Sequence, residues 1–439
     1  MWNQETINMN DLITLSAVEL NGLYVNLQEK YEGYITQKLK LDMSRGKPSP
    51  EQLDLSMGML DLLKSDDNLK SADGMDCRNY GGLDGIPEAK ELFAHILEVS
   101  PKEVIIGGSS SLSMMHDTVL RLLLHGAGEN EIPWGKLPTV KFLCPSPGYD
   151  RHFAICEQFN IEMVIINMLK DGPDMEQVEK LVSEDESIKG MWCVPKYSNP
   201  DGITYSDEVV DRLASMKTKA RDFRIIWDDA YTLHHLNNTP DKLKNMLATC
   251  KAAGNPDRVL MFTSTSKISF SGSGVAAMSA SENNLNFFRK QMAIQSIGPD
   301  KINQLRHVRF FKNLDVIQEH MKKHAAIIKP KFDVVLDILD TELSGTQIAS
   351  WNKPNGGYFI SLNTLDNCAK AVVSMAAEAG VTLTKAGATF PYGRDPHDKN
   401  IRIAPSYPSL TELRTAIEIL CLCVQMVSIK KLLAEGNNN

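Results

Sequence analysis

The chain has 439 residues, more than one hydrophobic core usually serves, so we expect two domains. Its 47 Lys and Arg against 55 Asp and Glu give a net charge of −8, which excludes the basic surface typical of proteins that bind nucleic acid or anionic membranes. No apolar run reaches the roughly 18 residues of a membrane span. We therefore expect neither nucleic acid nor a membrane as a partner.

The N-terminus and the cysteines indicate the compartment. Residues 1–10 are polar and lack the basic-then-apolar order of a signal peptide. The eight cysteines are scattered and form no C-x-x-C pair, so we expect small buried thiols and neither a metal site nor a disulfide framework. These features predict a cytoplasmic protein.

In chain order, a helix is predicted first over residues 10–40, and a loop follows over Leu41–Pro50. From about residue 70 to 300, short apolar runs bounded by turn residues alternate with helical patterns, which is typical of buried strands separated by helices. The runs cover residues 104–106, 140–143, 163–166, 191–194, 224–227, 259–262 and 274–278. The alternation predicts an α/β domain with a mostly parallel, seven-stranded sheet flanked by helices.

The two ends of the chain have a different pattern. A long helix is predicted over Lys301–Leu339, strands over residues 357–361 and 400–403, and a final amphipathic helix over residues 410–433. We expect a smaller α+β domain built from both ends. The expected division is an N-terminal segment at 1–65 that contributes to the small domain and a substrate loop, a large domain at 66–305 and the small domain at 306–439.

Three polar features follow predicted strands, where open α/β sheets bind ligands. Gly107–Ser111 precedes a helix, and its glycines and free N–H groups suit a phosphate, although a serine-rich helix cap is the better explanation of this segment taken alone. Asp228 ends a buried strand, where a carboxylate needs a cation. Lys267 follows another strand, whereas most lysines are solvated. Together they suit pyridoxal phosphate, which needs a phosphate site, a carboxylate for its pyridine nitrogen and a lysine for its Schiff base.

With these motifs the sequence resembles the class I/II aminotransferases, the fold-type I pyridoxal-phosphate enzymes, over nearly its whole length. In particular it is similar to a bacterial aspartate aminotransferase subgroup related to MocR-type aminotransferase domains. The matching motifs are Ser264-x-Ser266-Lys267, Asp228-Asp229-Ala230-Tyr231, Ser198-Asn199-Pro200-Asp201-Gly202, Pro145-x-Pro147-x-Tyr149, Gly108-Ser109-Ser110, Asn400-Ile401-Arg402-Ile403 and Arg45-Gly46-Lys47-Pro48.

The resemblance implies roles for these residues. Lys267 binds the cofactor and moves the proton between the substrate Cα and the cofactor. Asp228 binds the pyridinium, and Tyr231 binds the phenolic oxygen of the cofactor ring. The implied cofactor-binding residues are Gly108, Ser109, Ser110, Tyr149, Asn199, Asp228, Tyr231, Ser264, Ser266, Lys267 and, from a neighbouring subunit, Tyr80. The implied substrate-binding residues are Gly46, Asn199, Arg402 for the α-carboxylate and Lys301 for the side chain. A homodimer with shared active sites follows.

Two points stay open within the resemblance. The family usually has a phosphate-binding arginine eight residues after the lysine, where this chain has Val275, so serine hydroxyls and glycine backbone donors have to replace it. Lys301 falls where dicarboxylate-specific relatives place a cation from the partner subunit, and Arg45, Arg306 and Arg309 compete with it for the substrate side chain.

The function implied is a transaminase, with L-aspartate as amino donor and 2-oxoglutarate as acceptor. Another lyase or decarboxylase chemistry on the same scaffold is an alternative, since fold does not determine reaction. A third interpretation is a regulatory domain that holds the cofactor without catalysis. The lack of a basic helix-turn-helix segment argues against it.

Overall fold

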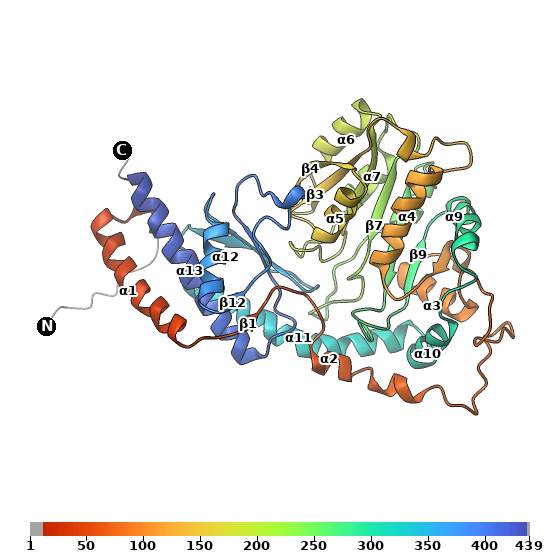
Figure 1. Cartoon of the computed structure of the whole chain (residues 1–439), viewed down its shortest axis with the longest axis horizontal. Helices are drawn as coiled ribbons and strands as arrows, with labels where there is room; N and C mark the ends of the chain where they lie inside the picture. The colour runs from red at the N-terminus through yellow and green to blue at the C-terminus, as the bar shows by residue number, and fades with distance from the viewer. Residues whose placement is uncertain (1–11, 437–439) are drawn as a thin grey trace.

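The computed structural model describes residues 12–436, so the polar segment 1–10 and the first residues of the predicted helix 10–40 lie outside it. Figure 1 shows two groups of elements, a larger one around a twisted sheet and a smaller one that holds both chain ends. The long helix α11 (Leu314–Leu343) runs along the base of the molecule between them.

The larger group is built on an eight-stranded sheet of order β2-β9-β8-β7-β6-β3-β4-β5. Its strands are β2 (Val104–Ile106), β3 (Lys141–Ser146), β4 (Glu162–Leu169), β5 (Gly172–Pro173), β6 (Ile188–Cys193), β7 (Arg224–Asp228), β8 (Val259–Ser264) and β9 (Ala276–Ser279). Strands β8, β7, β6, β3 and β4 pair in parallel, whereas β9 is antiparallel to both neighbours. The mostly parallel sheet is confirmed. The predicted count of seven misses β5, a two-residue strand that pairs with the end of β4 and is too short to leave an apolar run.

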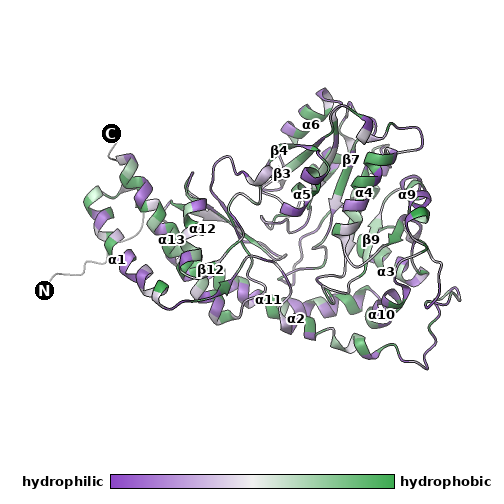
Figure 2. Ribbon diagram, viewed as in Figure 1, coloured by the Kyte–Doolittle hydropathy of each residue, from purple (hydrophilic) through white to green (hydrophobic). Residues whose placement is uncertain are grey.

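Helices cover both faces of this sheet. They include α3 (Pro87–Leu97), α4 (Ser111–His125), α5 (Asp150–Gln158), α6 (Met175–Glu184), α7 (Asp207–Ser215), α8 (Met246–Ala252) and α9 (Glu282–Gln295). Successive residues of a strand face opposite sides: Ile225 and Trp227 pack with α6, α7 and α8, and Ile226 packs with α4, α5 and α9. The strands are accordingly apolar on both faces, and the helices in Figure 2 carry their hydrophilic residues on the outside.

The smaller group consists of α1 (Ala17–Thr36), β1 (Leu41–Asp42), β10 (Ala349–Trp351), β11 (Ile360–Thr364), α12 (Ala369–Glu378), β12 (Val381–Thr382), β13 (Asn400–Ile403) and α13 (Leu410–Gly436). Strands β10, β11 and β13 form an antiparallel sheet, and β1 pairs with β12. One apolar core joins Leu23 and Leu27 of α1 to Leu420 and Val424 of α13. The smaller α+β unit built from both ends is therefore present, and its division at residues 65 and 305 stays a prediction.

The predicted helix Lys301–Leu339 is wrong as a single element. It is two helices, α10 (Lys301–Phe311) and α11, because Lys312 takes a positive φ of 56° and Asn313 then caps α11 by accepting a hydrogen bond from the Val316 backbone N–H.

The remaining composition-based expectations concern membranes and cysteines. Within residues 12–436, no helix is both long and apolar enough to cross a membrane. All eight cysteines are buried and free, as predicted for small apolar side chains.

Candidate active site

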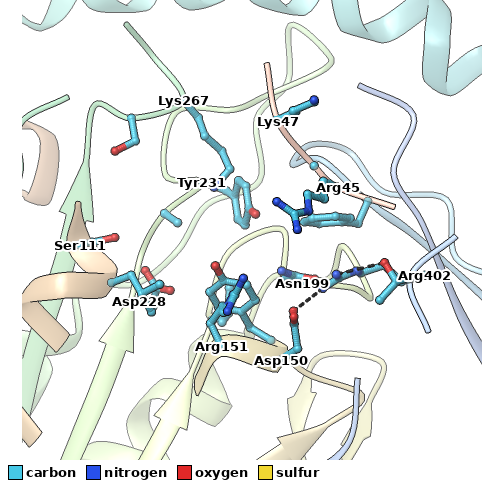
Figure 3. A pocket seen from close by; sticks show the side chains of 18 of the residues that line it. Arg45, Lys47, Ser111, Asp150, Arg151, Asn199, Asp228, Tyr231, Lys267 and Arg402 are labelled. Carbon is cyan, nitrogen blue, oxygen red and sulfur yellow. Dashed lines mark hydrogen bonds and ion pairs between the residues drawn. The ribbon is translucent and has the colours of Figure 1, made fainter. Parts of the chain in front are cut away.

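A cavity of about 520 Å³ opens at the carboxyl ends of the parallel strands. The predicted residues Gly46, Ser110, Tyr149, Asn199, Asp228, Tyr231, Ser264, Ser266, Lys267 and Arg402 all line it. Figure 3 shows the side chains of Asp228, Asn199 and Tyr231 gathered around one space, where Asp228 ends β7, Tyr231 follows that strand and Asn199 follows β6. Residues far apart in sequence thus meet because parallel strands end at a common edge.

Asp228 ends β7 and is 3% exposed. Its Oδ2 lies 3.1 Å from Nε2 of His152, and that imidazole stacks on Trp192 with 4.2 Å between ring centres. The other oxygen, Oδ1, is buried and has no hydrogen-bond partner among residues 12–436. Because an unpaired buried acceptor is costly, this oxygen is ready for an N–H donor from a bound molecule. A pyridinium N–H meets that requirement, so Asp228 fits pyridoxal phosphate.

Lys267 follows β8, and its Nζ lies 5.0 Å from the centre of the Tyr231 ring and 5.9 Å from that of Tyr358. Burial raises the pKa of the Tyr231 phenol above its usual value and that of Tyr149 to about 12, so both stay protonated donors near neutral pH. The amine therefore faces hydroxyl donors placed to contact a ring bound beside it.

Histidines hold the backbone directly after Lys267. The Nε2 atoms of His320 and His324 lie 2.9 and 3.1 Å from the carbonyl oxygen of Ile268, and Nε2 of His307 lies 2.9 Å from the hydroxyl of Ser269. Burial lowers the pKa of both His307 and His324 to about 4, so these side chains are neutral at physiological pH. The lysine side chain thus extends from a fixed, uncharged support.

The phosphate end of the cavity is built from serines at the N-terminus of α4 and after β8. Ser110 is the N-cap residue of α4, which leaves the first N–H groups of this 15-residue helix directed at the cavity. Hydroxyl Oγ of Ser266 donates to the carbonyl of Ser109 at 2.8 Å and lies 3.1 Å from Oγ of Ser264. Gly108 precedes them and its carbonyl accepts from the backbone N–H of Ala276, so Gly108 and Ser109 support the cavity wall through their backbones.

Val275 takes the place of the usual phosphate-binding arginine. Val275 is 2% exposed and packs in an apolar core with Ile106 and Ala277. A Cβ at the neighbouring Gly274 would lie 2.9 Å from Oγ of Ser266, so glycine allows the two segments to approach. Neutral serine and backbone donors fit the phosphate where the usual guanidinium is absent.

Arg402, on β13, is 7% exposed and crosses the far side of the cavity. Its Nη1 donates to Oδ1 of Asp150 at 2.8 Å and to Oδ1 of Asn199 at 3.2 Å, and Nη2 donates to the Thr384 hydroxyl at 3.2 Å. Nε is buried and has no partner within the part of the chain that the structure describes. The guanidinium, whose contact with Asp150 is drawn in Figure 3, is held in place with donor capacity to spare for a carboxylate.

The loop around Gly46 covers the cavity from the smaller group of elements. The Thr384 hydroxyl donates to the carbonyl of Ser44 at 2.7 Å, and the Ser406 hydroxyl donates to that of Lys47 at 2.9 Å. A Cβ on Gly46 would lie 2.4 Å from Cζ of Phe359, so no side chain fits there without displacing the ring. The loop is anchored on both sides of this glycine.

Tyr80 and Lys301 do not line this cavity. Tyr80 is 81% exposed, and Lys301 is 5% exposed with its Nζ donating to the carbonyl of Gly81 at 2.8 Å. Their contact with the site of a partner subunit stays a prediction. Of the competing arginines Arg45 lines the cavity, whereas Arg306 contacts Ser273 and Arg309 contacts the backbone of Asn68.

The sequence reasoning missed three residues of the first turn of α5. Asp150 binds Arg402, His152 binds Asp228, and Arg151 between them lines the cavity. Their position directly after Tyr149 could have revealed them. A helix that begins where a strand ends at a ligand site directs its first side chains at that site.

Comparison with known proteins agrees with this site. The family model for aspartate aminotransferases matches residues 15–436. A Mycolicibacterium smegmatis protein assigned to the aminotransferases is 49% identical over 98% of this chain and 99% of its own length. An aspartate aminotransferase of Corynebacterium glutamicum is 44% identical over 94% of this chain and 95% of its own length.

Solved structures agree on the fold. The crystal structure of an aspartate transaminase from Corynebacterium glutamicum superposes with a TM-score of 0.94, at 42% identity over 96% of this chain and 99% of that one. An α-aminoadipate aminotransferase of Thermus thermophilus shares the fold, with a TM-score of 0.73 at 18% identity over 92% of this chain and 97% of that one. The chain therefore belongs to the aspartate aminotransferase family, and it is a fold-type I, pyridoxal-phosphate-dependent aminotransferase.

Proposed function

We propose that this aminotransferase takes its amino group from L-aspartate and passes it to 2-oxoglutarate. The observation that carries the proposal is the charge of the cavity, which six Lys and Arg side chains line against two aspartates. One phosphate and a substrate with two carboxylates suit such a surplus of positive charge, and a neutral amino acid leaves part of it unmatched. The relative from Corynebacterium glutamicum that is named an aspartate aminotransferase supports the same substrate.

The roles proposed for the residues follow from their positions. When bound, the cofactor supplies an electron sink for the negative charge that develops at the substrate Cα. Asp228 Oδ1 holds a proton at the pyridine nitrogen, and Tyr231 and Asn199 donate to the ring's phenolic oxygen. Arg402 binds the substrate α-carboxylate and so turns the Cα–H bond toward Lys267. The Lys267 Nζ then takes and returns that proton as general base and acid.

The remaining contacts serve binding. Tyr149 packs on the cofactor ring, and Ser110, Ser264 and Ser266 donate to the phosphate together with the N-terminus of α4. Closure of the loop around Gly46 excludes water from the reacting atoms.

The test is a half-reaction screen on the purified holoenzyme. The cofactor's absorbance change is followed with aspartate, glutamate, alanine and phenylalanine in turn, and the products are identified. Aspartate and glutamate should react roughly tenfold faster or more at equal subsaturating concentration, the value of one charged contact, and yield only 2-oxo acids. Ammonia or carbon dioxide as a stoichiometric product would identify a lyase or a decarboxylase, and a preference for alanine would overturn the aspartate proposal.

We also propose a cytoplasmic homodimer in which Tyr80 reaches the partner's phosphate site. Two further apolar side chains near it are exposed, Ile294 at 89% and Ile297 at 59%. The two loops touch, because a Cβ on Gly298 would lie 2.4 Å from the carbonyl oxygen of Gly81. Exposed apolar groups on these adjoining loops and on the last turn of α9 support an interface here. The buried thiols support a reducing compartment.

Subunit mixing tests the shared site. An inactive Tyr80→Ala variant mixed with an inactive Lys267→Ala variant should regain part of the wild-type activity, since one of the two sites in a mixed dimer then carries neither change. No gain after verified subunit exchange would refute sharing across the interface.

A further inference from the structure

We propose that Arg45 and Arg151 together form the subsite for the side-chain carboxylate of a dicarboxylic substrate. The inference deepens the aspartate proposal and rests on it. It places specificity in two arginines of this chain, whereas the sequence had favoured Lys301 of a partner subunit.

The other cations of the cavity are mostly committed. Lys267 is reserved for the cofactor, Arg402 contacts Asp150, Asn199 and Thr384, and Lys47 lies 3.7 Å from the centre of the Tyr407 ring. For Arg45 and Arg151, in contrast, residues 12–436 provide neither a hydrogen-bond partner nor an ion-pair partner to the guanidinium group, and both line the cavity. Two guanidinium groups without partners are the groups best suited to bind a carboxylate, because each can donate two parallel hydrogen bonds to it.

The backbone of Arg45 is held at the cavity mouth. The carbonyl of Ser44 before it and that of Lys47 after it each accept a hydrogen bond from the smaller group of elements, and Gly46 packs on Phe359. The Phe359 ring also lies 4.9 Å from the guanidinium carbon of Arg402. Arg45 therefore extends from a position fixed relative to the α-carboxylate site.

Arg151 is fixed in the same way from the opposite wall. It is the second residue of α5, and both of its neighbours are pinned to the site: Asp150 to Arg402 at 2.8 Å and His152 to Asp228 at 3.1 Å. Its side chain consequently starts between the α-carboxylate site and the pyridine site.

Figure 3 shows both guanidinium groups directed into the space bounded by Tyr231, Asn199 and Arg402. A substrate whose α-carboxylate lies on Arg402 and whose amine faces Lys267 projects its side chain into this space. A four- or five-carbon dicarboxylate then meets the two arginines, and a neutral side chain leaves them solvated. Lys301 is less suited in this chain, because its Nζ already donates to the carbonyl of Gly81.

The experiment compares binding of succinate and butyrate, which differ by one carboxylate, to the holoenzyme by titration calorimetry. The variants are Arg45→Gln and Arg151→Gln, with Arg414→Gln as the matched control, because Arg414 is exposed on α13, does not line the cavity and loses the same charge. Each arginine variant should raise the Kd of succinate by roughly tenfold to a hundredfold, the value of a charged hydrogen bond. The Kd of butyrate should change by less than about threefold, as should both constants in the control.

A kinetic arm uses the same variants with aspartate and alanine. The kcat/KM for aspartate should fall and that for alanine should not. Equal losses for both substrates, or a loss selective for dicarboxylates in Arg414→Gln or Lys301→Gln alone, would overturn the subsite. A wild-type enzyme that binds succinate no more tightly than butyrate would instead refute the aspartate proposal itself, so the two failures are distinguishable.

Discussion

The wall behind Lys267 and the wall that faces it across the cavity are both rich in polar groups. They differ in charge and in whether their hydrogen-bonding groups have partners. Behind the lysine, His307, His320 and His324 hold Ile268 and Ser269 through hydrogen bonds at 2.9–3.1 Å, and burial keeps the pKa of all three histidines low. Across the cavity, Oδ1 of Asp228 and Nε of Arg402 are buried, and none of the described residues gives them a hydrogen-bond partner. The contacts of these three histidines are complete without a ligand, although Nδ1 of nearby His234 is buried without a partner among residues 12–436, and the second wall gains its missing partners only with ligands bound.

This difference assigns the two walls distinct tasks. A satisfied neutral network specifies one backbone conformation and gains nothing from a ligand. Buried groups without partners are costly in the empty protein, and a bound molecule that supplies the missing donor or acceptor removes the cost. We therefore expect changes on the facing wall to alter catalysis at constant stability, and changes behind the lysine to alter stability and its pH dependence.

The largest expected effect on the facing wall is that of Asp228→Asn. The amide no longer favours a protonated pyridine nitrogen, so stabilisation of charge at the substrate Cα is lost and kcat should fall by roughly a hundredfold or more. Substrate binding should change little. The measurement is the single-turnover rate with aspartate alongside the thermal midpoint. Near-normal turnover would show that Oδ1 is not the pyridine partner.

A smaller and uniform effect is expected from Arg402→Lys. Lysine keeps the charge but loses the fork, and a charged hydrogen bond is worth about 1.5–3 kcal/mol. The kcat/KM should therefore drop by roughly tenfold to more than a hundredfold for aspartate, glutamate and alanine alike, because all three carry an α-carboxylate. A loss confined to the dicarboxylates would mean that Arg402 binds the side-chain carboxylate. That is the role proposed for Arg45 and Arg151, so the two assignments would have to be exchanged.

The smallest effect belongs to the wall behind the lysine and concerns stability. The pKa of His324 is about 4 in the folded chain and about 6.5 when unfolded. Between these values the unfolded chain binds more protons, so the free energy of unfolding falls as the pH drops from 6.5 to 4, by at most about 1.4 kcal/mol per pH unit for one histidine. Above pH 6.5 this contribution no longer changes.

Urea unfolding at pH 7, 6 and 5 measures the slope. His324→Gln keeps a hydrogen-bonding side chain but does not titrate, so its stability should depend less steeply on pH than that of the wild type. The same slope in both proteins would refute a neutral buried His324.

The comparison also shows which parts of the site could be predicted from the sequence. Asp228, Asn199 and Lys267 were recognisable because each follows an apolar strand, and parallel strands end at a common edge. The partners Asp150 and His152 were not, because their contacts depend on how α5 packs against β13 and β7, across 252 and 76 residues of sequence. The local sequence pattern carries no information about contacts between elements so far apart in the chain.

Prediction of the fold from the sequence has the same limits. The strand runs and the two groups of elements follow from apolar periodicity, since burial on both faces requires it. The break between α10 and α11 rests on the positive φ of Lys312, which no propensity predicts for a lysine. Likewise β5 exists through two backbone pairings with β4 and has no sequence signature of its own.

The central claim is that Lys267 extends from the rigid wall to bind the cofactor covalently. Borohydride reduction of the yellow holoenzyme, followed by digestion and mass spectrometry, tests it most directly. The account predicts a single peptide that carries the reduced cofactor on Lys267, and no label in a Lys267→Ala variant that is otherwise folded. A reduced cofactor on any other lysine, such as Lys47 or Lys385 in the same cavity, would contradict the assignment of the site.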